Sequence, residues 1–340
     1  MVAKATLRDV AAAAGVGTAT VERVLNGRGG VRPETVEKVL LAVRRLGYGR
    51  ALPESHRGII RIEVILVRPE TSFYSRMNQA FERIAASLDH SIAVHRTFAR
   101  ENDPVDFVRI IATPKLRRSA LIVVAPDHPD VVESVRKAAS LGIPVVQIMT
   151  RPAPELPYVG IDNYAAGRTA AHYMSQMLSA RTGSFVALCH SGAYENHKER
   201  IRGFSTYLDE QGDAAHRFTQ VMFDRDDEHD AMELLGRALA RDPDIIGVYS
   251  AGGDNNGVAK VLQANALKSG ADAKIFWVGH ELTERTRRYL RQRLMSIVLD
   301  QAPEIQARRS IDLTLKSLGL MEVEVSTEPV RFLTVTSENL

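Results

Sequence analysis

A short segment near the N-terminus, residues 18–26, combines side chains that bind DNA with the spacing of a helix. Its apolar residues recur at helical spacing, which leaves small, polar and cationic side chains on the opposite face. An arginine on such a face can bridge O6 and N7 of guanine in the major groove, whereas hydroxyl and amide groups more often contact phosphate. The residues of this face are Thr18, Ala19, Thr20, Arg23 and Asn26.

The residues before and after this segment predict a helix-turn-helix around it. Thr6, followed three residues later by Asp9, predicts a capping box at the start of a first helix, and Gly15 supplies the turn. A third helix is expected from Pro33 onward, because proline suits a first helical position. Three helices close one small core, so residues 1–48 are predicted to form a DNA-binding headpiece.

The remainder of the chain has the pattern of an α/β protein. Residues 49–58 lack an apolar period and are predicted to form a linker. From Arg61 onward, short β-branched runs alternate with amphipathic stretches, which is typical of doubly wound parallel sheets. About ten strands are too many for one comfortable sheet, so two lobes are predicted. The strand candidates are residues 62–67, 92–98, 120–125, 144–149, 185–189, 218–223, 245–249, 275–278 and 297–299.

Composition narrows the class of protein. A chain of 340 residues with 45% hydrophobic content can bury a small core and a large one. The single cysteine, Cys189, excludes an internal disulfide framework and fits a reducing compartment. No signal segment or membrane span is apparent, so a cytoplasmic protein is expected. Residues 1–58 hold ten Lys/Arg and five Asp/Glu, a basic excess that suits phosphate binding.

The N-terminal segment resembles the headpiece of the LacI-type family of bacterial repressors. The residues at the helix cap, the turn, the core and the exposed face all match the family, in the same order along the chain. These positions are Thr6-Leu7, Asp9-Val10-Ala11, Ala14-Gly15-Val16, Thr20-Val21, Arg23-Val24-Leu25-Asn26, Thr35, Val39 and Leu46-Gly47-Tyr48.

The rest of the chain resembles the effector domain of the same family, a periplasmic-binding-protein-like fold of two α/β lobes joined by three crossovers. The resemblance implies an effector-binding and dimerisation domain over 59–340. Its N-lobe would comprise about 59–160 plus 296–324, and its C-lobe about 161–295 plus 325–340. The segments that carry the resemblance are Ser72-Phe73-Tyr74, Ile148-Met149-Thr150-Arg151, Val159-Gly160-Ile161-Asp162-Asn163, Glu199-Arg200-Ile201-Arg202-Gly203-Phe204, Val278-Gly279-His280-Glu281 and Asp300-Gln301-Ala302-Pro303.

The resemblance implies roles for the exposed residues of the second helix. Thr18 and Ala19 occupy the family's base-reading positions, and Arg23 lies one turn later. Arg23 is expected to read guanine; the alternatives are a solvated side chain or one held by Glu22 or by a phosphate. Gly17 and Glu22 stand where the family usually has serines, and a carboxylate near the DNA backbone would repel phosphate.

Other DNA contacts are expected to position the protein rather than read sequence. Thr20 and Asn26 are expected to contact phosphate, and Arg8 could contact phosphate or bases. Family members usually fold a hinge helix in the linker and wedge a leucine into the minor groove. Leu52 is the one apolar residue available for this role, but it precedes Pro53 in a short segment.

The effector site is expected at the carboxyl ends of the strands, where such sheets bind ligands. A sugar pocket needs aromatic side chains against C–H faces and polar side chains that hydrogen-bond hydroxyl groups. Each aromatic candidate could equally belong to the core. Thr150 stands where relatives often have aspartate, which suggests a different ligand. The candidates are Phe73, Tyr74 and Phe223 for stacking, and Arg151, Arg200, Asp254, Asn255, Glu281 and Gln301 for polar contacts.

Two further patterns are not assigned a metal-binding or catalytic role. The acidic run 224–230 lacks the glycine and terminal glutamate of a calcium loop, so a solvated loop is favoured. Cys189 beside His190 suggests nucleophilic chemistry, but adjacency in sequence says little about geometry. We therefore expect no metal, no cofactor and no enzymatic activity.

The combined prediction is a sequence-specific transcription regulator, with repression favoured over activation, controlled by a sugar-like effector. Its partners would be double-stranded operator DNA, the effector and a second copy of the chain, but no membrane. A homodimer is favoured because the C-terminal residues 330–335 are strand-like and no leucine heptads follow. The alternative is a sugar-binding transport component without a DNA role; an enzyme ranks third.

Overall fold

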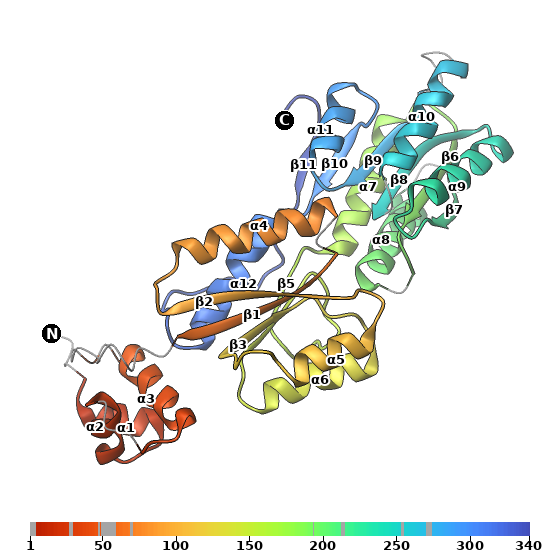
Figure 1. The fold of residues 1–340 in the computed structure, drawn as a ribbon. Helices are drawn as coiled ribbons and strands as arrows, with labels where there is room; N and C mark the ends of the chain where they lie inside the picture. Colours follow the sequence, from red (N-terminus) through yellow and green to blue (C-terminus); the bar gives the residue numbers. More distant parts are fainter. Residues whose placement is uncertain are drawn as a thin grey trace.

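The computed structural model describes residues 5–26, 30–46, 48, 59–68, 71–192, 194–211, 215–252, 255–269 and 274–340. The linker at 49–58, with Leu52 and Pro53, and the effector candidate Asp254 lie outside the described residues. In Figure 1 a small helical headpiece is followed by two α/β lobes, with the C-terminus on the far lobe.

The headpiece contains α1 (Leu7–Ala14), α2 (Thr18–Leu25) and α3 (Pro33–Arg45). The predicted capping box is confirmed, since Thr6 and Asp9 bond reciprocally at the start of α1. Gly15 ends α1 with φ 63°, a left-handed conformation that favours glycine. Residues from all three helices form one small core: Val10, Ala11, Ala14, Val21, Val24, Leu25, Val39, Leu40, Ala42 and Val43.

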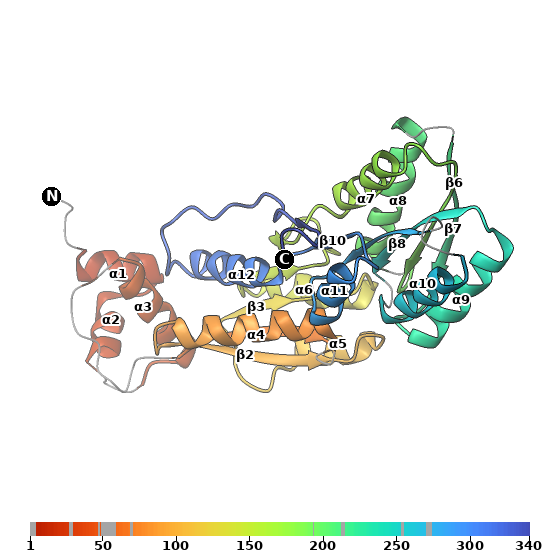
Figure 2. The ribbon, with the colours of Figure 1, turned by 90° about the horizontal axis from the view of Figure 1, so that it is seen from above.

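The N-lobe contains a parallel five-stranded sheet in the order β2-β1-β3-β4-β5. Helices α4 and α12 cover one face and α5 and α6 the other (Figures 1 and 2). The central strands are almost fully buried because both faces are covered. The elements are β1 (Ile60–Val67), α4 (Ser72–Ser87), β2 (Ile92–Ala99), α5 (Pro104–Ala112), β3 (Ala120–Val123), α6 (Pro129–Ser140), β4 (Val145–Ile148), β5 (Tyr158–Val159) and α12 (Pro303–Ser317).

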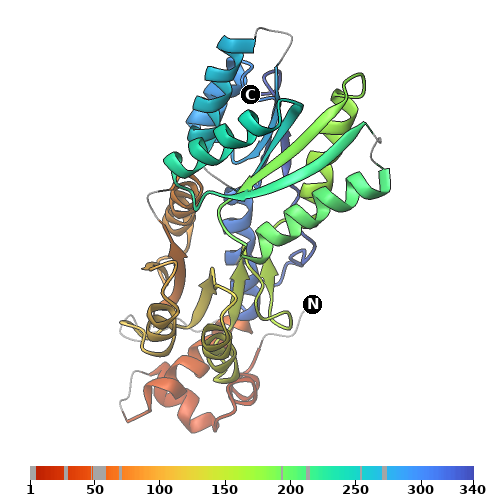
Figure 3. The ribbon, with the colours of Figure 1, turned by 90° about the vertical axis from the view of Figure 1, so that its right-hand side faces the viewer.

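The C-lobe contains a six-stranded sheet in the order β11-β10-β9-β8-β6-β7, parallel except for β11. Figure 3 shows this lobe stacked above the N-lobe, with the headpiece below both. The elements are α7 (Asn163–Met177), β6 (Gly183–Cys189), α8 (Glu195–Gln211), β7 (His216–Phe223), α9 (Glu228–Arg241), β8 (Ile245–Gly252), α10 (Asn255–Ser269), β9 (Phe276–His280), α11 (Glu284–Arg291), β10 (Ile297–Asp300) and β11 (Leu333–Val335).

The structure corrects one predicted lobe boundary. The sequence places residues 296–324 in the N-lobe, whereas β10 pairs with β9 in the C-lobe sheet and the chain crosses only after Asp300. A buried apolar strand can belong to either sheet, so its composition does not show which strand it pairs with. The short strand β5, at the predicted crossover, extends the N-lobe sheet.

The crossovers lie close together between the lobes. The chain passes from β5 to α7, from β10 to α12, and back along the segment before β11. The first and third passages are joined because the Val330 N–H donates to the Gly160 carbonyl at 2.8 Å. This arrangement matches the three crossovers expected from the resemblance. No helix among the described residues is long and apolar enough to cross a membrane.

Candidate functional site

The predicted DNA-reading face of α2 is open. Thr18, Ala19, Arg23 and Asn26 are exposed and Thr20 is half-buried, whereas the opposite face packs into the headpiece core. Helix α3 lies between α2 and the lobes in Figures 1 and 2, so the lobes do not cover this face.

Arg23 is not held by an ion pair to a neighbouring residue in the described part of the chain, so its guanidinium can contact DNA. Glu22 is also exposed, but no ion pair joins Arg23 to it or to another carboxylate within the described ranges. Arg8 is exposed on α1. Gly17 begins α2 without a side-chain cap, which is the structural consequence of having no serine there.

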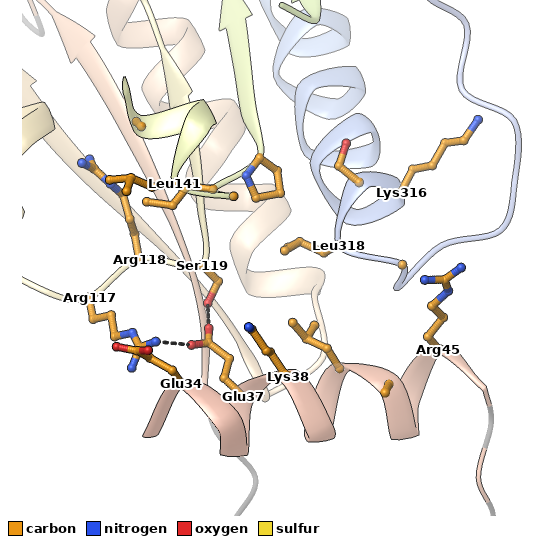
Figure 4. Close-up of a pocket in the computed structure, with 18 of the residues that line it drawn as sticks. Glu34, Glu37, Lys38, Arg45, Arg117, Arg118, Ser119, Leu141, Lys316 and Leu318 are labelled. Atoms are coloured by element: carbon orange, nitrogen blue, oxygen red, sulfur yellow. Dashed lines mark hydrogen bonds and ion pairs between the residues drawn. The ribbon is translucent and has the colours of Figure 1, made fainter. Parts of the chain in front are cut away.

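The headpiece docks onto the base of the N-lobe through α3 (Figure 4). The Ser119 hydroxyl donates to Glu37 Oε1 at 2.9 Å, and Arg117 Nη2 lies 3.1 Å from Glu37 Oε2. Leu41 packs against the N-lobe core. A groove of about 2050 Å³ remains between headpiece and lobe. The docked helix contacts the amino end of the sheet, opposite the end that ligands use.

A cavity of about 400 Å³ lies between the two lobes. Its lining comes from residues at or just after the carboxyl ends of β1, β2, β4, β6, β7, β8, β9 and β10, and from α4, α8, α10 and α11. Both sheets therefore direct their ligand-binding ends at one space, as expected for this fold class. The volume suits a ligand of monosaccharide size.

The structure brings six of the nine effector candidates into this cavity: Phe73, Tyr74, Arg200, Asn255, Glu281 and Gln301. Arg151 and Phe223 do not line it. The Arg151 guanidinium donates to the Pro154 carbonyl at 2.7 Å, within its own exposed loop. Phe223 is 51% exposed because side chains alternate along β7 and Met222 takes the buried position.

Arg200 is the most deeply buried cation of the cavity, at 2% exposure. Its Nε donates to Asn163 Oδ1 and its Nη1 donates to the Ala251 carbonyl, both at 2.9 Å. Its Nη2 has no hydrogen-bond partner. The guanidinium is thus fixed on one side and unsatisfied on the other.

Glu281 is held by backbone and side-chain contacts at the end of β9. Gln301 Nε2 donates to its Oε1, while its Oε2 has no partner. Burial and the nearby Asp300 raise the pKa of Glu281 to about 8, against the opposing hydrogen bond from Gln301. Near neutral pH this carboxyl therefore exists largely in its protonated form.

Aromatic side chains form two opposing groups. In the N-lobe, the rings of Phe73 and Tyr74 lie edge to face with centroids 5.3 Å apart. In the C-lobe, His190, Tyr194 and His197 lie with ring centroids 5.7–6.0 Å apart. Burial lowers the pKa of His197 to about 3, so the His197 ring is neutral at physiological pH. Both lobes therefore contribute flat aromatic surfaces to the cavity.

An ion pair bridges the two lobes at the cavity. Arg68, after β1, pairs with Asp226, after β7, and its Nε lies 3.5 Å from Glu101 Oε2. On a neighbouring side, Arg76 of α4 contacts Asp300 in the C-lobe at 2.7 Å. The lobes are therefore held together by charged groups as well as by the crossovers.

Backbone strain concentrates at this site. Among the described cavity residues, Arg68, Met149, Asp226 and Glu281 have φ values of 45°, 67°, 55° and 72°. Non-glycine residues rarely adopt this region, and such conformations gather at ligand-binding sites.

Sequence reasoning missed several cavity residues. Arg68 lies one residue and Glu101 two residues after the end of a strand of the N-lobe, so the rule that favours side chains near strand ends could have found them. His190 and Asp226 belong to patterns that were assigned to a loop or to chance adjacency. The others are Thr71, Met149, Tyr194, Asn196, His197, Ser250, Gly252, Asn256, His280, Thr283, Arg285 and Thr286.

The described residues contain no cluster of three or more histidine, cysteine, aspartate or glutamate side chains that could hold a metal ion. Cys189 is buried beneath the cavity region at the end of β6, and burial raises the pKa of its thiol to about 12. A thiol with so high a pKa is a poor nucleophile.

Two family models match the chain. A model described as bacterial regulatory proteins, lacI family, matches residues 6–50, and a model described as periplasmic binding protein domain matches residues 62–319. The second model spans most of the chain, and the two together follow the division into headpiece and lobes.

Two curated relatives are named as regulators of transcription or of an operon. The HTH-type transcriptional regulator DegA of Bacillus subtilis is 28% identical over 218 residues, covering 62% of each chain. The ribose operon repressor of Halalkalibacterium halodurans is 24% identical over 273 residues, covering 78% of this chain and 74% of that one. The match spans less than two thirds of the length of DegA.

Among solved structures, a periplasmic solute binding protein of Actinobacillus succinogenes with bound D-allose matches with a TM-score of 0.70. It is 20% identical, and the match covers 82% of this chain and 98% of that one. At this identity the likeness establishes the fold of the two lobes.

Proposed function

Because this chain belongs to the lacI family of bacterial regulatory proteins, with a periplasmic binding protein domain behind its headpiece, we propose that it is a ligand-controlled transcription regulator. It binds operator DNA through α2 and a small effector in the cavity between the lobes. Repression is favoured because several relatives are named repressors, among them the ribose operon repressor.

The observation that carries this proposal is the presence of both sites in one chain. The open face of α2 offers a guanidinium, hydroxyls and an amide to a major groove. The cavity offers buried polar atoms without partners, which are costly unless a ligand satisfies them. The docked α3 joins the headpiece to the N-lobe, whose opposite end forms one side of the cavity.

The unpartnered atoms favour a polyhydroxylated effector. Asn196 Oδ1 and Asn255 Oδ1 are buried acceptors that need donors, and Arg200 Nη2 is a buried donor. Hydroxyl groups serve as donor and acceptor at once, while the aromatic groups suit the C–H faces of a sugar ring. D-allose in the related binding protein has this chemistry.

We further propose a homodimer that acts in the cytoplasm on chromosomal DNA. One headpiece contacts a short half-site, and two headpieces related by a two-fold axis read half-sites about one helical turn apart. Effector binding then changes the relative placement of the headpieces, a coupling of about 1–3 kcal/mol in typical allosteric proteins. No catalytic step is part of this function.

The proposal is tested by selecting duplexes from a pool of random-sequence DNA with the full chain, in the presence of competitor DNA and at two salt concentrations. We expect enrichment of a near-palindromic sequence whose binding weakens as salt increases. A matched selection with the Arg23→Ala variant should enrich a more degenerate sequence. If no sequence is enriched although the headpiece is folded, the regulator proposal fails.

The same experiment separates the alternative, a sugar-binding transport component. That reading explains the lobes, which resemble solute binding proteins, but it leaves residues 6–50 without a role. Binding of a sugar by the full chain without any sequence-specific DNA binding would favour it.

A further inference from the structure

The surroundings of Arg200 carry information about the charge of the effector. This side chain is 2% exposed and reaches the cavity from α8. Its two satisfied nitrogens are bound by an amide oxygen and a carbonyl oxygen, both neutral. The third, Nη2, is buried and has no partner.

No ion pair compensates this guanidinium among the described residues. Thr150 lines the cavity from the N-lobe, but its hydroxyl donates to the Ala125 carbonyl at 2.7 Å. Arg68 instead has two carboxylates, Asp226 and Glu101, beside it. The negative charge of the cavity is thus concentrated at Arg68 and not at Arg200.

The carboxyl of Glu281, whose charge would act on Arg200, does not supply the missing charge at neutral pH. Burial raises the pKa of Glu281 to about 8, so its carboxyl is largely protonated there. His280 is kept neutral because burial lowers its pKa, and His197 likewise. A buried cation without a counter-charge is unfavourable, and an anionic ligand removes that cost.

We propose that the effector is a polyhydroxylated carboxylic acid whose carboxylate binds Arg200 Nη2, while its hydroxyl groups satisfy Asn196 and Asn255. This inference rests on the proposed function only in assuming that the cavity binds a small effector. A carboxylate has the planar acceptor geometry that a guanidinium prefers, and the amide oxygens remain matched to hydroxyl donors.

The test uses matched pairs that differ in one carboxylate: D-gluconate against D-glucitol, and D-galacturonate against D-galactose. Binding to the full chain is measured by thermal shift and calorimetry. Trp277, the single tryptophan, gives a third readout, since its Nε1 donates to Ser250 Oγ at 2.8 Å and Ser250 lines the cavity. We expect at least one acid to bind tenfold or more tightly than its neutral partner.

The outcomes separate this inference from the proposed function. Binding of the neutral compounds with equal or greater affinity overturns the carboxylate assignment and leaves a polyol-binding regulator. Binding of D-glucose 6-phosphate but of neither acid overturns it in favour of a phosphate. Failure of all these probes, together with no selected DNA sequence, counts against the proposed function itself.

Three variants test which residues determine the charge preference. Arg200→Gln should reduce the preference for the acid to less than twofold, and Arg200→Lys, which keeps the charge, should retain part of it. Glu281→Gln should have the same affinity for the acid at pH 7 and at pH 9, whatever the absolute value of that affinity. Wild type should lose affinity at pH 9, because the ionised Glu281 carboxylate then faces the ligand carboxylate.

The expected loss of acid affinity at pH 9 can be assigned to Glu281 by considering the charged groups around it. Asp300 is paired with Arg76. Burial lowers the pKa of Arg200, but a guanidinium is not deprotonated in proteins. Burial raises the pKa of Tyr74 far above this range. An equal loss of acid affinity at pH 9 in wild type and in Glu281→Gln would contradict the assignment. The groups that face Glu281 are Arg200 from α8, Asp300 and Gln301 from the β10 end, and Arg76 and Tyr74 from α4.

Discussion

Arg23 is the cationic side chain on the open face of α2, and its role in reading DNA can be isolated by charge-matched variants. If it bridges guanine, Arg23→Ala should reduce discrimination at one base pair of each half-site by about 1–3 kcal/mol. Competition binding with single-base variants of the selected sequence measures this loss. Arg217→Ala removes one exposed cation from the far lobe and serves as the control. Uniform weakening across all base variants would instead indicate a phosphate contact.

The raised pKa of Glu281 predicts how the free energy of unfolding changes with pH. Its pKa is about 8 in the folded protein against an ordinary value of 4.5, so the folded state binds the extra proton between these pH values. The free energy of unfolding therefore falls as pH rises from about 4.5 to 8, and the loss is complete above pH 8. Glu281→Gln should remove this slope without affecting the opposite contribution of His197 at lower pH. Melting temperatures of both proteins across pH 4–9 check the difference, and parallel curves would contradict it.

Residues that follow strands were predictable where their chemistry was distinctive. Glu281 is predicted because charged side chains at strand ends seldom serve only packing, and the structure places it in the cavity. Arg151 satisfies the same rule, yet its guanidinium is bound within its own loop. The rule gives the end of the sheet that a residue occupies, but not the direction of its side chain, which depends on contacts distant in sequence.

At the scale of helices, α7 and α8 approach closely because each has a glycine that faces the backbone of the other helix. A Cβ added at Gly167 would lie 2.0 Å from the Arg200 carbonyl oxygen, and one at Gly203 would lie 2.1 Å from the Tyr164 carbonyl oxygen. These are backbone atoms, so an added methyl group forces the helices apart.

Gly167→Ala should therefore displace Arg200 and weaken effector binding at least tenfold, with a stability loss of about 1–3 kcal/mol from overpacking. Gly236→Ala is the matched control, since a Cβ there meets nothing within 4 Å in α9. It should stabilise the protein by about 0.5–1 kcal/mol, because glycine is costly inside helices. Thermal unfolding and calorimetry with D-gluconate check both variants. Normal effector binding by Gly167→Ala would show that the helix contact does not position Arg200.

Element types were easier to predict than element partners. The capping residues of α1 and the alternation of strands and helices are local features, and both predictions are confirmed. The assignment of β10 to a lobe depends on which distant strand it pairs with. The two-residue strand β5 is too short to have a period at all. Long-range pairing is therefore the part of the fold that a single sequence specifies least visibly.

At the scale of the whole molecule, the headpiece is attached by a small contact that should be reversible. Glu37 is partly exposed, so its bonds to Ser119 and Arg117 are expected to stabilise docking by only about 1 kcal/mol. Spin labels at Ala13→Cys and Val105→Cys, both exposed positions, report the headpiece–lobe distance. Glu37→Gln should broaden the distance distribution. Glu34→Gln, the same charge change one turn earlier on α3, should leave it unchanged, and equal broadening in both variants would count against a specific dock.

The relation between the lobes should depend on the ion pair of Arg68 and Asp226, which lie on opposite sides of the cavity. Both side chains are about one-fifth exposed, so breaking the pair is expected to cost about 1 kcal/mol and to shift the closed-to-open ratio about fivefold. Asp226→Asn should then increase the radius of gyration of the effector-free protein in small-angle scattering. Asp230→Asn breaks the ion pair of Arg225 and Asp230 in the same segment without bridging the lobes, and should leave the radius unchanged. Because Arg68 and Asp226 act as one unit, adding Arg68→Met to Asp226→Asn should open the protein little further. Fully additive effects would mean that each residue acts alone and that the pair does not hold the lobes together.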